Sequence, residues 1–350
     1  MKQIFILFMV AMCATMFTAC SKDDDKDPLD DNGGNGAKEG MITMIAESDR
    51  IKVHIETFNE GDIITIDWGD GTVEEFKSVE EYDDDWDEIH YVLSIDYYVE
   101  HEYSNRNPHI VTIKGNISEF WQGEGTWHNN ITSLNVSKCP ALTILDCAGN
   151  NLTSLDVSKN TALTELFCKD NNLTSLDVSK CPALTELGCW SNKLTSLDVS
   201  GCTALTELDC SYNNLTSLDI SKNTALTELD CSYNNLTSLN VSGCTALTEL
   251  DCSYNNLTLL DVSKNTALTE LDCRHNNLTL LNVSGCTALT ELECRNNNLT
   301  SSALNQIFRD LPQGKTGDDG YSQSRIFIYD NPGRETCDKS IAKNKGWDVY

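Results

Sequence analysis

The chain has 350 residues, of which 54 are acidic and 25 are basic, so its formal net charge at pH 7 is -29. Nucleic acid and anionic membrane surfaces repel such a polyanion, so neither is an expected partner. Hydrophobic residues make up 40% of the chain and it has only 6 prolines, a composition that can bury cores and excludes a wholly disordered chain.

Residues 1–19 have the pattern of an export signal. Lys2 precedes an apolar run from Ile4 to Phe17. A run of about 14 residues is too short to cross a hydrocarbon core of about 30 Å as a helix. We therefore expect a cleaved leader and not a membrane anchor.

The segment Phe17-Thr18-Ala19-Cys20 resembles the lipobox of bacterial lipoproteins, which implies that Cys20 is lipidated and becomes the new N-terminus. The next residues, Ser21–Asp25, are similar to the surface-export tag of Bacteroidetes lipoproteins. Together they imply an outer-membrane lipoprotein exposed on the cell surface and held in the membrane only by its lipid. An ordinary secretory signal with an unmodified cysteine is the alternative. Residues 20–40 are mainly Asp, Gly, Lys and Asn, which predicts a disordered acidic tether.

Residues 41–117 show alternating apolar and polar side chains, as in Ile51–Ile55 and Ile63–Ile66, and no helical periodicity. This pattern predicts an all-β unit. The motif Trp68-Gly69-Asp70-Gly71, followed by His101-Glu102-Tyr103, resembles the polycystic-kidney-disease (PKD) type of immunoglobulin-like β-sandwich. The acidic stretch 80–88 is expected to be a solvated loop, with a calcium site as the alternative.

A repeat with a period of 21 residues begins at Leu142 and follows the pattern Leu-x-x-Leu-x-Cys-x-x-Asn-x-Leu in eight copies. The first, fourth and sixth positions of a short strand would point inward, and stacked copies would build a parallel sheet with strands about 4.8 Å apart. The asparagine is expected to satisfy backbone groups where the strand turns. A degraded copy precedes the first, with Asn129, Ile131, Leu134 and Val136.

This pattern is identified as a leucine-rich-repeat solenoid over residues 118–300. Each copy consists of two similar halves, as in 205–214 and 215–225, an arrangement that resembles the bacterial "IRREKO" class of these repeats. Halves this short leave no room for a helix, so we expect extended or short-strand segments on the back of the solenoid as well.

The cysteines are expected to be buried free thiols, although an exported protein with 16 of them would ordinarily suggest disulfides. One row fills an inward apolar position where cysteine acts as a small hydrophobe: Cys147, Cys168, Cys189, Cys210, Cys231, Cys252, Cys273 and Cys294. In a second row, Cys alternates with Asn: Cys139, Asn160, Cys181, Cys202, Asn223, Cys244, Asn265 and Cys286. A bridge between Cys181 and Cys202 is the alternative, and no zinc site is expected.

Residues 301–350 are expected to close the open end of the solenoid as a small α/β cap. Residues 303–312 have helical spacing and end in proline, residues 325–329 form an expected strand, and residues 338–345 form a last short helix. The fold class is therefore mainly β, with a parallel leucine-rich-repeat solenoid between an immunoglobulin-like or PKD-like sandwich and this cap.

The sequence lacks a catalytic motif or a phosphate-binding glycine loop, and its carboxylates recur with the repeat, so we expect neither an enzyme nor a cofactor. The face beside each strand is predicted to carry an acidic trough and an aromatic strip suited to ligand binding. The candidate residues there are Phe167, Lys169, Trp190, Tyr212, Tyr233, Tyr254, Arg274, His275 and Arg295.

The predicted function is non-enzymatic: a monomeric surface lipoprotein whose solenoid binds another protein, as in adhesion or host interaction. A carbohydrate-binding accessory protein and a purely structural spacer are the alternatives. The regular coils look like duplications of one another, so the residues that depart from the repeat are the better candidates for a binding site.

Overall fold

The computed structural model describes residues 39–83, 88–93, 98–122, 129–315 and 323–350. The predicted leader, Cys20 and almost all of the predicted tether lie outside the described residues. No helix within the described ranges is long and apolar enough to cross a bilayer.

The N-terminal part of the described chain is entirely β, as predicted. One sheet has the strand order β10-β1-β8-β3-β4. Its strands are β1 (Gly40–Ala46), β3 (Ile63–Asp67), β4 (Val73–Lys77), β8 (His109–Gly115) and β10 (Ile131–Lys138). The second group of strands contains β2 (Arg50–Thr57), β5 (Val79–Asp83), β6 (Glu88–Val92), β7 (Val99–Glu102) and β9 (Ile117–Gln122). Buried side chains of both groups belong to one hydrophobic core.

The predicted motif residues lie together in this core. Trp68 is fully buried, His101 stacks on its ring with 4.9 Å between ring centroids, and the Tyr103 hydroxyl donates to the Trp68 carbonyl over 2.8 Å. Gly69 has a φ of 81°, and a Cβ there would lie 2.3 Å from the Ile110 carbonyl oxygen. Only glycine fits that close backbone approach.

The acidic stretch 80–88 is not the loop that its composition suggests. Strands β5 and β6 pair antiparallel, with Glu80 opposite Tyr91 and Glu81 opposite His90. Within the stretch 80–88, only residues 84–87 lie outside the described residues. Because β5 is the last strand of its sheet, its backbone pairs on one side only, and the Glu80 side chain is exposed to water. The acidic composition of this stretch therefore did not reveal that its two ends form paired strands.

Strand β9 connects the sandwich to the solenoid. It pairs antiparallel with β2 on one side and parallel with β11 (Ile144–Asp146) on the other. The predicted division after residue 117 falls within β9, after its first residue, and β10, which contains most of the degraded first repeat, pairs with β1. The sheet of the sandwich therefore continues directly into the sheet of the solenoid.

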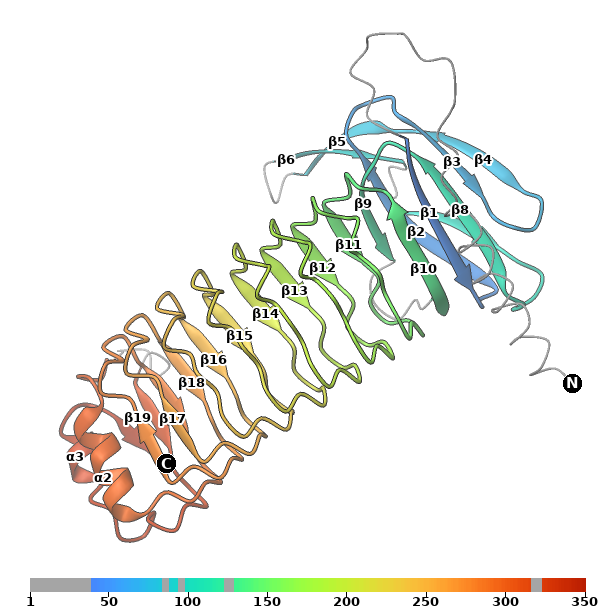
Figure 1. The fold of residues 1–350 in the computed structure, drawn as a ribbon. Helices are drawn as coiled ribbons and strands as arrows, with labels where there is room; N and C mark the ends of the chain where they lie inside the picture. Colours follow the sequence, from blue (N-terminus) through green and yellow to red (C-terminus); the bar gives the residue numbers. More distant parts are fainter. Residues whose placement is uncertain (1–38, 84–87, 94–97, 123–128, 316–322) are drawn as a thin grey trace, which may run out of the picture. The chain divides into compact units, whose positions relative to one another are not determined.

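The solenoid is a stack of coils in which each 21-residue repeat supplies one strand to a parallel sheet (Figure 1). The central leucines lie in register, for example Leu208 opposite Leu229. After β11 the strands are β12 (Glu165–Phe167), β13 (Glu186–Gly188), β14 (Glu207–Asp209), β15 (Glu228–Asp230), β16 (Glu249–Asp251), β18 (Glu270–Asp272) and β20 (Glu291–Glu293).

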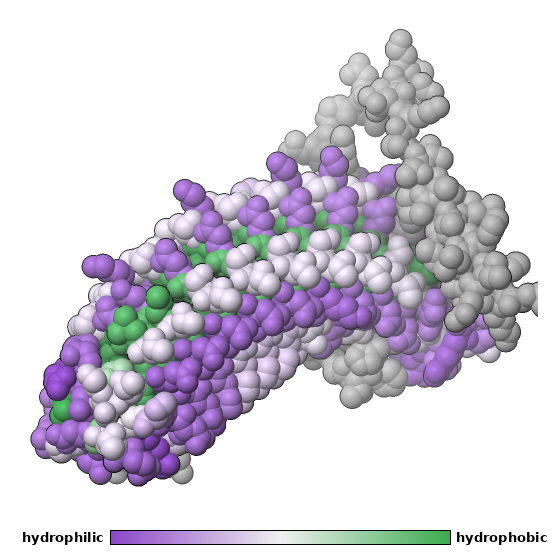
Figure 2. All heavy atoms as spheres, turned by 60° about the horizontal axis from the view of Figure 1, so that its bottom comes forward, coloured by the Kyte–Doolittle hydropathy of each residue, from purple (hydrophilic) through white to green (hydrophobic). Residues whose placement is uncertain are grey.

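The back of the solenoid is extended, as predicted from the short half-repeats. Two short strands, β17 (Leu259–Asp261) and β19 (Leu280–Asn282), pair in parallel, and isolated bridges join Asp156, Asp177, Asp198 and Asp219. No helix occurs between residues 139 and 300, all of which the structure describes. Figure 2 shows one face, on which hydrophilic rows run beside a narrow hydrophobic band. Equivalent repeat positions thus form continuous rows.

A ladder of asparagines supports each turn in the predicted way. The Asn234 amide nitrogen donates to the carbonyl oxygens of Cys210 and Cys231, over 3.0 and 3.2 Å. Its side-chain oxygen accepts from the Leu215 backbone N–H over 2.9 Å. Each asparagine therefore links its own coil to the preceding one.

The described cysteines are free thiols, and the predicted inward row is fully buried. Cys181 and Cys202 are both unbridged. The two rows differ in polarity: the Cys202 thiol donates to the Val178 carbonyl over 3.3 Å, and Asn223, one coil later, donates to the Val199 carbonyl over 3.0 Å. The second row therefore faces carbonyl acceptors, whereas Cys210 lies among apolar groups with no such contact among the described residues.

This difference predicts that replacement by serine destabilises the protein more in the first cysteine row than in the second. Cys210→Ser should destabilise the protein by about 1 to 3 kcal/mol because the buried hydroxyl has no partner. Cys202→Ser is the matched control and should cost less than about 1 kcal/mol, since its hydroxyl inherits the Val178 carbonyl. Urea unfolding measures both. Equal losses would contradict the assignment, as would ready labelling of Cys210 by a thiol reagent in the native protein.

The cap contains α2 (Ser301–Asp310), β21 (Arg325–Phe327), α3 (Ser340–Lys343) and β22 (Asp348–Val349). Helix α2 begins earlier than predicted because the Thr300 hydroxyl accepts from the Ala303 backbone N–H and caps it. Strand β21 pairs parallel with β20 and extends the solenoid sheet, and β22 follows it. The last coils are thus covered by paired strands and helices.

Candidate functional site

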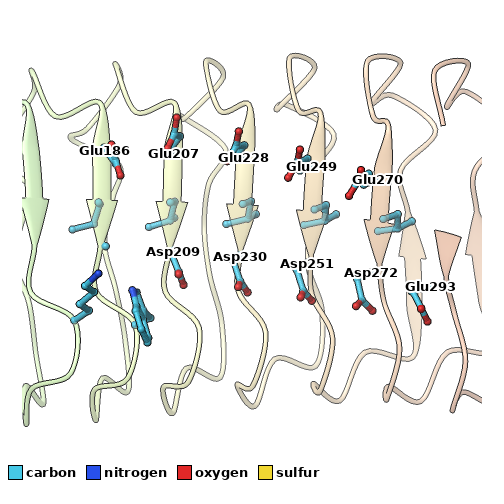
Figure 3. A pocket seen from close by; sticks show the side chains of 18 of the residues that line it. Glu186, Glu207, Asp209, Glu228, Asp230, Glu249, Asp251, Glu270, Asp272 and Glu293 are labelled. Carbon is cyan, nitrogen blue, oxygen red and sulfur yellow. The ribbon is translucent and has the colours of Figure 1, made fainter. Parts of the chain in front are cut away.

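Two carboxylate rows define a groove along the solenoid sheet, here called the acidic trough (Figure 3). Successive strand residues point to opposite faces, so the two residues that flank each inward leucine both point outward. The trough has a volume of about 570 Å³. Its glutamate row is Glu186, Glu207, Glu228, Glu249, Glu270 and Glu291, and its inner row is Asp209, Asp230, Asp251, Asp272 and Glu293.

The carboxylates of the inner row are partly buried, and each makes ionisation of its neighbours less favourable. Parallel strands bring equivalent carboxylates to about 4.8 Å from one another, and like charges at that distance oppose ionisation. Burial, reinforced by neighbouring acids, raises the pKa of Asp230 to about 6 and that of Asp272 to about 7. Each aspartate also accepts a backbone hydrogen bond, as from Ser232 to Asp230 over 2.8 Å. These acids are therefore poised for neutralisation by a proton or a cation.

The N-terminal end of the trough departs from the repeat. Phe167 replaces the aspartate of its row, and Gly188 follows it one coil later. A Cβ at Gly188 would lie 3.1 Å from the Phe167 ring, so the glycine leaves room for the aromatic side chain. The Lys169 ammonium lies 5.3 Å from the centroid of the Trp190 ring. All four residues line the trough and give this end a mixed aromatic and basic character.

The C-terminal end carries arginines that pair with acids of their own coils. The Arg274 Nε atom lies 3.2 Å from Asp272, and the Arg295 Nε atom donates to Glu293 over 3.0 Å. Both guanidinium groups also lie over aromatic rings, at 5.8 Å from Tyr254 and 5.0 Å from Tyr329. Arg274 lines the trough.

The predicted aromatic strip lies beside the trough, since the Arg274 guanidinium lines the trough and also lies over the Tyr254 ring. Tyr212, Tyr233, Tyr254 and His275 form a continuous stack, here called the aromatic ladder, with 4.1 Å between successive ring centroids. None of them lines the trough. Each of these residues has a φ between 50° and 52°. The backbone is therefore left-handed at the aromatic residue, and the alternation of the strand no longer sets the direction of its side chain. Strand alternation alone could not reveal that change of direction.

One polar cluster in the sandwich was not predicted from the sequence. The Glu56 carboxylate is buried and contacts His54 Nε2 at 2.9 Å and His90 Nδ1 at 3.0 Å. Burial opposes ionisation of Glu56, but hydrogen bonds with the two histidines outweigh it and lower its pKa. No local motif marks this cluster because its members come from β2 and β6. Within the described ranges, no group of three or more His, Cys, Asp or Glu could hold a metal ion.

A family model described as leucine-rich repeats (2 copies) matches residues 182–223. No curated protein gives a significant match. The functional domain of InlJ from Listeria monocytogenes, which includes a cysteine ladder, is 33% identical, with 63% of this chain and 58% of that chain covered and a TM-score of 0.45.

A leucine-rich-repeat protein of Leptospira interrogans is 23% identical, with 61% and 56% covered and a TM-score of 0.52, a likeness of fold. The chain thus spans less than two thirds of both solved structures.

Proposed function

We propose that this leucine-rich-repeat solenoid is a binding scaffold and that its acidic trough holds a basic segment of another protein. The supporting observation is the charge of the trough: its only basic lining residues, in the part of the chain that the structure describes, are Lys169 and Arg274, against two continuous carboxylate rows. Leucine-rich-repeat domains commonly bind proteins, and no catalytic family is indicated.

The energetics favour a cationic partner. Burial denies partly buried carboxylates such as Asp230 and Asp272 the hydration that would stabilise their ionised form, which raises the pKa of each. Arg274 already pairs with Asp272, and a guanidinium or ammonium group that enters the trough would supply a countercharge to acids such as Asp230. Phe167 and Trp190 offer an apolar contact at one end, where aromatic residues act as anchors in many interfaces.

Binding of a labelled peptide of alternating Arg and Ser residues tests this function. Glu228→Lys reverses a charge at the centre of the trough and should weaken binding about tenfold. Glu60→Lys, the same change at an exposed site in the sandwich, is the control and should leave the affinity nearly unchanged. About 0.5 M salt should weaken the complex. If both variants weaken binding equally, or a Glu-for-Arg peptide binds as well, the trough is not the site.

We also propose that Cys20 carries a lipid anchor that places the protein on the outer surface of the cell, with a PKD-like sandwich between tether and solenoid. The support is the sequence pattern around Cys20. Cys20→Ala should move the protein from the membrane fraction to the soluble fraction. Replacement of Lys22, Asp23 and Asp24 should retain the lipid and prevent surface exposure. Cleavage of that second variant by protease added to intact cells would contradict the surface tag.

A further inference from the structure

The aromatic ladder ends abruptly at Tyr212. Its rungs are linked by backbone hydrogen bonds, from the Tyr212 N–H to the Ser232 carbonyl and from the Tyr233 N–H to the Ser253 carbonyl. Tyr233 and Tyr254 each have a ring on both sides, whereas Tyr212, among the residues that the structure describes, stacks only on Tyr233. Tyr212 is 52% exposed, and both inner tyrosines are less so. One face of the Tyr212 ring is therefore open.

Two smaller residues continue the same ladder beyond the open face. Ser191 and Asp170 have φ values of 55° and 53°, and their N–H groups donate to the carbonyls of Ser211 and Trp190. They occupy the positions that aromatic rings fill in the later coils, one and two coils from Tyr212. A serine side chain is too small to cover a phenol ring. A flat ring stacked on Tyr212 would thus lie at the level of Ser191.

The polar groups near this face carry both signs of charge. Asp170 is an exposed carboxylate in the same ladder. In the adjacent row, the Lys193 ammonium donates to the Asn172 side-chain oxygen over 2.8 Å. These coils carry the Ser191 hydroxyl, the Asp170 carboxylate, the Lys193 ammonium and the Asn172 amide. Together these groups offer both acceptors and donors, which suits a ring that bears several hydroxyl groups. The Lys193 ammonium disfavours a cation here.

We propose that the open face of Tyr212 is a carbohydrate-binding site for a neutral pyranoside. The sugar ring stacks on the phenol, its hydroxyl groups donate to Asp170 and Ser191, and they accept from Lys193. This site lies on the turns of the solenoid and not in the acidic trough. Its ligand class and its residues differ from those of the proposed protein-binding function, so each can fail without the other.

Saturation-transfer NMR with the purified protein and the methyl glycosides of glucose, galactose, mannose and N-acetylglucosamine tests the site. At least one glycoside should receive saturation, and Tyr212→Ala should weaken its binding about tenfold. Asp170→Asn should weaken it severalfold, because one acceptor becomes neutral. Methylguanidinium, a flat cation of similar breadth, should bind less well than the sugar.

The matched control is Tyr254→Ala, which removes a ladder ring whose two faces are covered and should change glycoside binding less than about twofold. Glu228→Lys in the trough should also leave it unchanged. Circular dichroism verifies that each variant is folded. The proposal is overturned if no glycoside binds, if Tyr254→Ala and Tyr212→Ala lose binding equally, or if methylguanidinium is preferred.

Discussion

Asn234→Ala is expected to destabilise the solenoid by about 3 to 5 kcal/mol, because it leaves several buried polar groups unpaired at once. The Asn234 side chain is buried and bonds to the carbonyls of Cys210, Cys231 and Ser232 and to the Leu215 N–H. Alanine removes all four contacts, and neither water nor another side chain replaces them inside the coil. The shift of the urea midpoint measures the loss.

The neighbouring Asn235→Ala is the control. Asn235 is exposed, and its backbone N–H donates to the Leu215 carbonyl, a bond that alanine retains. Its loss should stay within about 0.5 kcal/mol. A similar loss in both variants would mean that the ladder of asparagines contributes little to stability and that the leucine contacts alone hold the coils together.

The second Asn row should behave differently from the first. Asn223 donates to the carbonyls of Val199 and Cys202, but its side-chain oxygen is buried with no partner among the described residues. Asn223→Cys should therefore be nearly neutral, because cysteine fills the same position in the adjacent coils and donates to the same kind of carbonyl. The repeat tolerates exchange here because only a donor is needed.

The solenoid could be predicted from sequence because its period gives each position the same surroundings in every coil. One copy fixes which side chains point inward, and the copies confirm one another: Leu, Cys and Asn each form the expected row. The acidic trough followed from the same alternation, since Glu228 and Asp230 flank Leu229. A repeated pattern thus conveys geometry as well as fold class.

The parts that could not be predicted depend on chain direction or on distant contacts. The ladder rings left the trough because residues such as Tyr233 take a left-handed conformation that a tyrosine rarely adopts. Strands β5 and β6 were hidden by their acidic composition, and the Glu56 cluster joins residues from two strands. No local pattern carries either kind of information.

The stability of the protein is expected to peak near about pH 4 and to fall by about 3 kcal/mol between pH 5 and 8. The folded chain holds the pKa of Asp230 at about 6 and that of Asp272 at about 7, above the ordinary unfolded value of about 3.9. Between these values the folded chain binds more protons than the unfolded chain. Stability is therefore fully present below about pH 4 and is lost as the pH rises through 6 and 7.

Acids on the back of the solenoid set the lower limit of this window. The backbone N–H of Ser158 donates to Asp156 over 2.9 Å, and the N–H of Ser179 donates to Asp177 over 2.9 Å. These bonds lower the pKa of both aspartates. For such groups the unfolded chain binds protons first as the pH falls, so their contribution is lost below about pH 4.

Asp230→Asn isolates the contribution of the trough. The amide is neutral at every pH, and its oxygen can still accept from the Ser232 N–H that now donates to Asp230. The variant should be about 1 to 2 kcal/mol more stable than the native chain at pH 8, less so at pH 5, and equally stable below about pH 4, because only there is the native carboxyl protonated in both the folded and the unfolded chain. Urea unfolding across this pH range measures both.

Glu228→Gln is the control for this experiment, since it removes one negative charge from the same strand at an exposed position. It should change the free energy of unfolding by less than about 0.5 kcal/mol at either pH, because water already solvates that carboxylate. A gain at pH 8 as large as that of Asp230→Asn would attribute the effect to net charge. A gain confined to Asp230→Asn would attribute it to burial in the inner row, the same property that makes the trough receptive to a cation.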